Sequence, residues 1–213
     1  MSNEVCPSCG STPEHSTRCA ECGSSGVGVL YTPFSYTPNL LAYSVADYWC
    51  QALRTDLAWT RHGTTPRMEY YHSVLGLPYS YGVKEFARTY ESQPTTPALE
   101  CLWDIAEQEA GCPFDVCFLN RYLDQSDHLG WHSDNSPEMD DGRPIAIISL
   151  GVEREIWFRA IGSTDAVQKL KLEHGSLCLM HAGMQDTHQH RIPKAGRKCG
   201  ERISLTFRGY VAP

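Results

Sequence analysis

The periodicity of apolar residues changes once along this chain, close to Pro113. Before this point apolar side chains recur at the spacing of an amphipathic helix, and after it they alternate with polar side chains as in half-buried strands. Helices followed by a run of strands predict an α+β domain in which the helices pack on one sheet. The 213 residues are enough for one full-sized hydrophobic core, so we expect a single main domain with a small appendage.

Two helices are expected before the change of period. The first would have Ser44 as its N-cap and end before Gly63, with apolar positions at Val45, Tyr48, Trp49, Ala52, Leu53 and Leu57. The second would begin at Thr96-Pro97, where proline suits the first turn, and end at Gly111. Strands are expected at about 115–123, 144–150, 155–159, 167–172, 176–181 and 202–209.

The last expected strand has an unusual polar face. Alternation puts Arg202, Ser204, Thr206 and Arg208 on one side of it and apolar residues on the other. Six strand steps span roughly 20 Å, so two inward-leaning arginines can reach both ends of a small dicarboxylate. A solvated strand face is the alternative, although such faces more often mix both charge signs. The segment 116–122 likewise places Val116, Phe118, Asn120 and Tyr122 on one face.

A metal site is suggested by His132-Ser133-Asp134, because residues two apart in an extended segment point to the same face. A third ligand must come from downstream, where the candidates are His174, His181, His188 and His190. Two imidazoles and one carboxylate form a facial triad that leaves metal positions open for a chelating substrate and O2. Taken alone, the His-x-Asp pair also fits a polar loop after Gly130.

The N-terminal cysteines form two CxxC-Gly turns, with Cys6 and Cys9 in the first and Cys19 and Cys22 in the second. This spacing allows four thiolates to surround one Zn²⁺, and His15 between the pairs is an alternative ligand. Unrelated surface cysteines are the other interpretation. A Gly/Ser-rich linker follows, so we expect a zinc-ribbon-like segment with its linker at 1–28, structural or used to dock nucleic acid or protein, and a main domain at 29–213.

Composition limits the classes of partner. The net charge of −7 argues against a broad grip on duplex nucleic acid, although the basic C-terminal stretch leaves local anion binding open. No apolar run approaches the roughly 18 to 20 residues of a membrane span, and the first residues do not resemble a secretion signal. We therefore expect a soluble monomer in the cytoplasm, or in the nucleus of a eukaryote, with its cysteines as thiols or metal ligands.

Six motifs occur in an order and spacing that resemble the AlkB family of nucleic-acid dealkylating dioxygenases, which depend on Fe(II) and 2-oxoglutarate. The resemblance covers about Val45 to Tyr210 and is specific from Asn120 onward. The fold of that family is a double-stranded β-helix, a jelly roll braced by helices on one side. The motifs are Asn120-Arg-Tyr122, Asp127-His-Leu-Gly130-Trp-His132-Ser-Asp134, Pro144-Ile-Ala-Ile-Ile-Ser-Leu-Gly151, His174-Gly-Ser-Leu177, Thr187-His-Gln-His190-Arg-Ile-Pro193 and Arg202-Ile-Ser-Leu-Thr-Phe-Arg208.

The resemblance implies roles for particular residues. The iron ligands would be His132, Asp134 and His190, with His190 favoured over His188 because the family's distal histidine lies three residues before a proline, here Pro193. For 2-oxoglutarate, Arg202 and Tyr122 would hold the far carboxylate, and Arg208 and Asn120 the chelating end. Ser204 and Thr206 would line the same face, although Ser204 replaces an Asn found in some members.

The resemblance also implies a base-recognition region formed by Arg67, Tyr79, Tyr81 and Ser136, in which the ring of Tyr81 stacks on an extruded base opposite His132. Burial of the tyrosines in the core is the alternative. Ser136 departs from the family, whose repair members carry Asp or Glu at this position. The nearest acidic residue on that side is Glu138.

The activity implied is oxidation of an N-methylated base at the expense of O2 and 2-oxoglutarate, with release of formaldehyde, succinate and CO2. Nucleic acid with alkylated bases would be the partner, with DNA favoured over RNA. Ser136 and the acidic charge keep open a hydroxylase of a nucleobase, a nucleotide or a protein side chain. A third interpretation is a non-catalytic binding module in which the zinc segment docks onto a partner.

Overall fold

The computed structural model describes residues 32–81, 88–164 and 167–211, and Phe34–Pro213 form one compact unit. The expected zinc segment, with Cys6, Cys9, Cys19 and Cys22, lies outside the described residues. The helices are α1 (Tyr43–Asp56), α2 (Pro97–Ala110) and the short α3 (Met184–Thr187). The strands are β1 (Phe34–Thr37), β2 (Met68–Ser73), β3 (Tyr79–Tyr81), β4 (Arg88–Tyr90), β5 (Val116–Tyr122), β6 (Leu129–His132), β7 (Ile145–Gly151), β8 (Arg154–Ala160), β9 (Gln168–Leu172), β10 (Ser176–Met180), β11 (His188–Ile192) and β12 (Arg202–Arg208).

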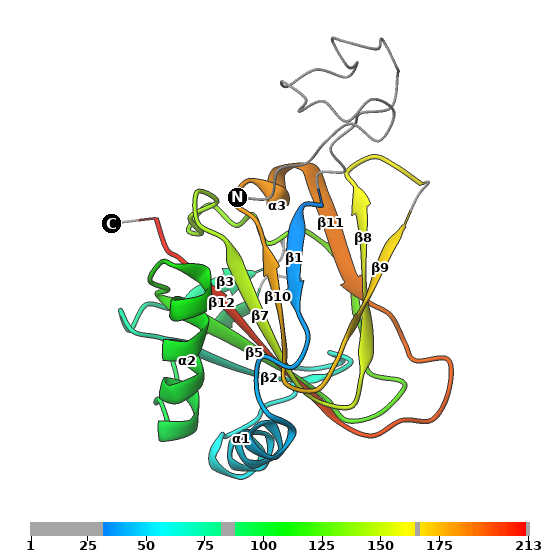
Figure 1. The fold of residues 1–213 in the computed structure, drawn as a ribbon. Helices are drawn as coiled ribbons and strands as arrows, with labels where there is room; N and C mark the ends of the chain where they lie inside the picture. The colour runs from blue at the N-terminus through cyan, green and yellow to red at the C-terminus, as the bar shows by residue number, and fades with distance from the viewer. Residues whose placement is uncertain (1–31, 82–87, 165–166, 212–213) are drawn as a thin grey trace, which may run out of the picture. The chain divides into compact units, whose positions relative to one another are not determined.

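Two antiparallel sheets form the body of this unit. The larger has six strands in the order β1-β10-β7-β12-β5-β2, and the smaller has four in the order β6-β11-β8-β9. The pair β3-β4 stands apart as a two-stranded sheet. Figure 1 shows α1 and α2 on one side of the larger sheet and the strands of the smaller sheet on the other. The expected α+β architecture, rich in antiparallel strands and braced by helices, is confirmed.

Alternation along β12 gives the larger sheet two different faces. Ile203, Leu205 and Phe207 are fully buried in a core shared with α1 and α2. A second core lies between the sheets, where Ile147 of the larger sheet and Phe158 of the smaller one belong to one apolar cluster. The polar residues of β12 therefore point away from the helices and toward the smaller sheet.

Helix α2 follows the prediction at both ends. The side chain of Thr96 accepts a hydrogen bond from the backbone N–H of Leu99, and Pro97 occupies the first turn. Gly111 ends the helix with φ 68°, a left-handed conformation that glycine adopts without strain, and its N–H donates to the carbonyl of Glu107. Local cap chemistry was sufficient to locate this helix.

Helix α1 corrects the prediction of its N-cap and of part of its buried face. The N-cap is Ala42, without a side-chain cap bond, so Ser44 lies within the first turn. Ala46, Cys50 and Leu53 are buried, whereas Tyr48 is 65% exposed. This buried face packs against β7 of the larger sheet.

All six expected strands are present to within two residues, but six other strands were not predicted: β1, β2, β3, β4, β6 and β11. Of these, β6 and β11 carry histidines where an ordinary strand would carry apolar side chains. Within the described residues, no helix combines the length and the apolar composition that a bilayer span requires.

Candidate active site

The expected metal donors come together at the edge of the smaller sheet. His132 ends β6 and lies directly opposite His190 of β11 in the antiparallel register, while Asp134 follows in the loop. The Nε2 atoms of His132 and His190 are each 3.6 Å from a carboxylate oxygen of Asp134. One donor atom from each residue lies within 4.8 Å of the others, and in the described part of the chain no other group of three His, Cys, Asp or Glu does this.

The orientation of the donors is fixed by their neighbours. Nδ1 of His132 lies 2.9 Å from the carbonyl of Gly130, which places the ring proton on Nδ1 and leaves the Nε2 lone pair facing the cluster. The backbone N–H of Asp134 donates to the side-chain oxygen of Gln185 at 3.0 Å, which holds the loop after β6 against α3. These two hydrogen bonds hold the donor residues in a fixed orientation, as metal binding requires.

The protonation states also suit a divalent cation. Burial lowers the pKa of His132, and burial together with neighbouring His132 lowers the pKa of His190 to about 3. Burial raises the pKa of Asp134, but Arg208 and the two histidines outweigh it, and the pKa falls to about 2. At neutral pH the cluster therefore holds two neutral imidazoles and one carboxylate, the forms that bind metal.

The other histidine candidates lie outside this cluster. Nδ1 of His188 is 2.8 Å from the hydroxyl of Thr187. His174 accepts from the backbone N–H of Gly151 at 2.8 Å, and its other nitrogen is 3.2 Å from Asp47. The cluster includes His190 rather than His174, His181 or His188, as expected.

A pocket between the two sheets joins the cluster to the polar face of β12. All three metal donors line it, and so do all six residues expected to contact 2-oxoglutarate: Asn120, Tyr122, Arg202, Ser204, Thr206 and Arg208. The register explains this, because Arg202 pairs with Tyr122 and Ser204 with Asn120 on neighbouring β5. Residues on one face of two adjacent strands necessarily line the same space.

Arg202 carries a buried guanidinium that forms no ion pair with a described carboxylate. It is fully buried, and Nη2 donates to Ser149 Oγ at 2.8 Å and lies 3.3 Å from Ser204 Oγ. Its Nε and Nη1 are buried without a hydrogen-bond partner, and burial lowers its pKa to about 10. An unpaired buried guanidinium is costly, so this end of the pocket fits an anionic group.

Arg208 stands at the metal end of the same face. Its Nη1 lies 3.4 Å from Oδ1 of Asp134, and its Nε is buried without a hydrogen-bond partner. The guanidinium is also 5.4 Å from the ring of Tyr79. Two buried arginines with unused donors at separate points of one pocket fit a small dicarboxylate such as 2-oxoglutarate.

Arg67 lies in the pocket wall, paired within the protein. Its Nε donates to Oδ1 of Asn120 and its Nη2 to Glu69, both at 2.6 Å. Glu69 also accepts from the hydroxyl of Tyr90 at 3.1 Å. Because the amide oxygen of Asn120 faces Arg67, its NH2 group is left to donate elsewhere. Sequence reasoning missed Glu69 and Tyr90, whose strands β2 and β4 gave no clear alternating signal.

The expected base-recognition residues are only partly brought together. Tyr79 is 3% exposed, lines the pocket, and its hydroxyl lies 3.0 Å from Ser136 Oγ. The backbone of Tyr81 pairs with Arg88 in the small sheet, but its side chain lies outside the described part of the chain. Glu138 is exposed. Tyr79 is thus a buried wall residue, as the alternative reading of the tyrosines allowed.

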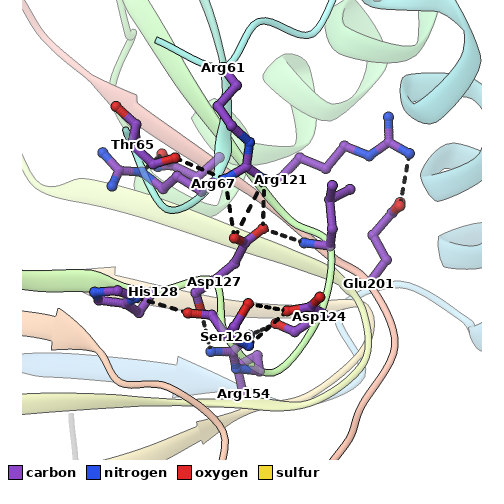
Figure 2. A network of polar contacts seen from close by, with 12 residues as sticks. Arg61, Thr65, Arg67, Arg121, Asp124, Ser126, Asp127, His128, Arg154 and Glu201 are labelled. Atoms are coloured by element: carbon purple, nitrogen blue, oxygen red, sulfur yellow. Dashed lines mark hydrogen bonds and ion pairs between the residues drawn. The ribbon is translucent and has the colours of Figure 1, made fainter. Parts of the chain in front are cut away.

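Figure 2 shows a polar network around Asp127 and Arg154, which adjoins the start of β6. Arg154, 3% exposed, donates to the carbonyl of Asp127 before β6 at 2.8 Å and to that of Pro193 after β11 at 2.6 Å. The carboxylate of Asp127 accepts from the backbone N–H of Leu123 and pairs with Arg61 at 3.2 Å. Sequence reasoning did not find the roles of Arg61 and Arg154.

The two-sheet fold, the His-Asp-His cluster and the two buried arginines of the pocket define a metal-dependent oxygenase with a facial triad and a dicarboxylate cosubstrate. A family model described as the 2OG-Fe(II) oxygenase superfamily matches residues 33–208, and the chain belongs to this superfamily. It is an AlkB-type enzyme, an Fe(II) and 2-oxoglutarate dependent dioxygenase.

Similar proteins support this placement. The chain is 31% identical to mouse "DNA oxidative demethylase ALKBH2" over 169 residues, 76% of this chain and 69% of that protein. It is 30% identical to human "Alpha-ketoglutarate-dependent dioxygenase alkB homolog 3" over 186 residues, 80% of this chain and 64% of that protein. The structure described as "The structure of OsALKBH1" shares the fold, with a TM-score of 0.60, 18% identity, and coverage of 83% of this chain and 97% of that one.

Proposed function

We propose that this enzyme oxidatively demethylates N-alkylated bases in nucleic acid, with DNA favoured over RNA, and releases formaldehyde, succinate and CO2. The observation that carries the proposal is the single pocket that contains both the His-Asp-His cluster and the two buried arginines. Its support on the substrate side is the similarity to proteins named DNA oxidative demethylase. We also assign the two sheets to a double-stranded β-helix and retain the zinc segment at 1–28 as part of the proposal.

His132, Asp134 and His190 would bind the iron, which when bound supplies the oxidation of the cosubstrate and of a C–H bond by O2. The protein holds these donors ready. Arg208 keeps Asp134 ionised, since the guanidinium favours the charged carboxylate. The carbonyl of Gly130 keeps the Nε2 lone pair of His132 turned toward the cluster.

The cosubstrate would lie along the polar face of β12. Arg202 would bind the far carboxylate with Tyr122 and Ser204 beside it, because its Nε and Nη1 have no other partner. Arg208 and the free NH2 of Asn120 would address the other end, with Thr206 between the two arginines in the strand. Burial of these donors excludes water, which strengthens each charge-assisted hydrogen bond.

The substrate base would enter beside Tyr79 and Ser136, with Tyr81 as the stacking ring and Arg67 supporting the wall. Ser136 offers a neutral hydroxyl already bonded to Tyr79, where an acidic residue would favour a cationic methylated base. This contact supports a second candidate, the same oxidation applied to an uncharged nucleobase, nucleotide or protein side chain.

The test is release of succinate and formaldehyde by the purified full chain with Fe(II), ascorbate and 2-oxoglutarate. Single-stranded and duplex oligonucleotides that carry 1-methyladenine or 3-methylcytosine would be compared with unmethylated ones. Release of both products only with the methylated oligonucleotides would support demethylation. Succinate without formaldehyde would favour the second candidate, and no succinate under any condition would contradict both.

A further inference from the structure

The outer face of the smaller sheet carries a ladder of alternating cations and tryptophans that the catalytic site does not use. The guanidinium of Arg159 lies 4.2 Å from the ring centroid of Trp131, and that of Arg191 lies 4.9 Å from Trp131 and 4.2 Å from Trp157. The ammonium of Lys169 lies 4.2 Å from Trp157. These five residues, the cation–tryptophan ladder, come from β6, β8, β9 and β11 and so cross the whole sheet.

The ladder lies on the reverse side of the strands that carry the metal donors. Trp131 directly precedes His132, and Arg191 directly follows His190. Since successive residues of a strand point to opposite faces, the histidines face the pocket and the ladder faces outward. β6 is also the edge strand of its sheet, so Trp131 lies at the border next to the cluster.

Among the described strand residues, the ladder face carries one carboxylate, that of Glu155, which accepts a hydrogen bond from Nε1 of Trp157 at 2.7 Å and forms no ion pair with a ladder cation. No carboxylate in the described part of the chain forms an ion pair with Arg159, Arg191 or Lys169, and Arg159 instead bonds the neutral side chain of Gln189 at 3.0 Å. Of the other described arginines, Arg88, Arg154 and Arg202 donate to uncharged groups, whereas the following are paired with acids: Arg54, Arg61, Arg67, Arg121, Arg143 and Arg208. In a chain of net charge −7, unpaired cations gathered on one face indicate an anionic partner.

The geometry suits a polyanionic strand better than a single anion. Four strands at a spacing of about 4.8 Å span roughly 14 Å, which corresponds to about four nucleotides at the roughly 3.4 Å rise of one strand. Stacking on the indole rings holds the cations in defined positions, so less side-chain freedom is lost when they contact phosphates. Basic residues interleaved with aromatic rings are typical of nucleic-acid surfaces.

We propose that the cation–tryptophan ladder binds the phosphate backbone of the nucleic-acid strand whose base enters the pocket, because its unpaired cations lie on the reverse of the metal-donor strands. This inference rests on the proposed function and adds a second contact surface to it. The alternative is that the ladder only stabilises the exposed face of the sheet.

The chain offers a matched pair of variants for the test. Lys169 and Lys171 lie on the same face of β9, but Lys169 stacks on Trp157, whereas Lys171 lies 3.8 Å from Glu153. Binding of a fluorescently labelled, unmethylated single-stranded oligonucleotide to the full chain would be measured by anisotropy at several salt concentrations. We expect Lys169→Gln to weaken binding about threefold and to lower the salt slope by roughly 0.7, the value for one phosphate contact.

Lys171→Gln should change the affinity less than twofold. The double variant, Arg159→Gln combined with Lys169→Gln, should weaken binding about tenfold. Equal losses for Lys169→Gln and Lys171→Gln would overturn the ladder as the binding element. An unchanged salt slope in the double variant would overturn it as well. If poly-glutamate displaces the oligonucleotide as well as an equal charge of unlabelled oligonucleotide does, the face binds acidic polymers in general and the nucleic-acid assignment is wrong.

A second readout separates this inference from the proposed function. Succinate formed without nucleic acid reports the catalytic site, and it should be the same in the double variant as in the original chain. With a methylated oligonucleotide, KM should rise while kcat is retained. If formaldehyde is never released but the salt slope still falls in the double variant, the demethylase proposal fails and the binding surface stands.

Discussion

At the residue scale, the site is built from side chains whose charge is set by burial. His132 and His190 are held neutral, and Asp134 is held ionised beside Arg208. The same pocket keeps the charge of Arg202 without a compensating acid. Binding of a cation to the cluster and of an anion to the arginines should therefore raise the free energy of unfolding.

The lowered pKa of the histidines predicts a pH-dependent stability of the metal-free protein. An unfolded histidine binds a proton near pH 6.5, whereas folded His190 does so only near pH 3. The unfolded state therefore binds more protons below about pH 6.5, and stability should fall as the pH drops from there toward 3. Urea unfolding in the presence of a chelator measures this. The explanation fails if His190→Asn leaves the slope between pH 7 and 5 unchanged.

We expect Arg202 to determine the affinity for 2-oxoglutarate, because its buried Nε and Nη1 have no hydrogen-bond partner among the described residues. Charge-assisted hydrogen bonds contribute about 1.5–3 kcal/mol each, so Arg202→Gln should raise the KM for 2-oxoglutarate about a hundredfold. Arg121→Gln is the control, because Arg121 lies on adjacent β5 and is paired with Glu201 at 2.8 Å, outside the pocket lining. A similar KM in both variants would show that Arg202 does not bind the cosubstrate.

At the element scale, the sequence predicted what local chemistry determines. Helix α2 was located by its caps, and the polar face of β12 by alternation alone, since the opposite face carries Ile203, Leu205 and Phe207. β11 was missed because its histidines replace the apolar side chains that mark a strand. The N-cap of α1 was misplaced because Ala42 provides no side-chain signal.

The contacts that position the site across elements could not be predicted. Arg67 pairs with Asn120 across 53 positions of sequence, and Arg154 contacts Pro193 across 39. Such pairings depend on which strands become neighbours, and no periodicity encodes that. The zinc segment stays a prediction, since its cysteines lie outside the described residues.

The two metal-donor strands pair through their backbones, and Arg154 adds a side-chain bridge between the segment before β6 and the segment after β11. Replacing Arg154 with Met removes the donor to the carbonyls of Asp127 and Pro193, and each unsatisfied buried acceptor costs about 1–3 kcal/mol. We expect the free energy of unfolding to fall by about 3 kcal/mol and metal affinity to fall with it. Urea unfolding and metal titration measure the two effects.

Arg61→Met is the matched control for this change. Arg61 pairs with the carboxylate of Asp127 from a more exposed position, so its loss should cost about 1 kcal/mol or less. If the two variants lose equal stability, the ion pair and not the bridge between the strands orders this region.

At the scale of the whole molecule, function depends on the meeting of two sheets. The smaller sheet supplies the two histidines, the larger supplies the arginines, and the pocket between them contains both sets. We propose that substrate choice depends on Ser136, which is bonded to Tyr79 of the pocket lining.

We expect Ser136→Asp to change the substrate preference. A carboxylate at this position favours a cationic methylated base, so kcat/KM for 1-methyladenine should rise relative to that for an uncharged methylated base, by about tenfold. Ser133→Asp is the control, because Ser133 donates to the carbonyl of His188, whereas Ser136 contacts Tyr79 of the pocket lining. Competition assays with both substrates measure the ratio, and an unchanged ratio would place Ser136 away from the base.

The most direct test of the central claim is the intact mass of the oligonucleotide itself. An oligonucleotide with one 1-methyladenine or 3-methylcytosine would be incubated with the full chain, Fe(II), ascorbate and 2-oxoglutarate, and with Asp134→Ala in parallel. We predict loss of the methyl group with the original chain and no change with the variant. A methylated oligonucleotide that keeps its mass while 2-oxoglutarate is consumed would contradict demethylation of these bases, and equal demethylation by Asp134→Ala would contradict the site.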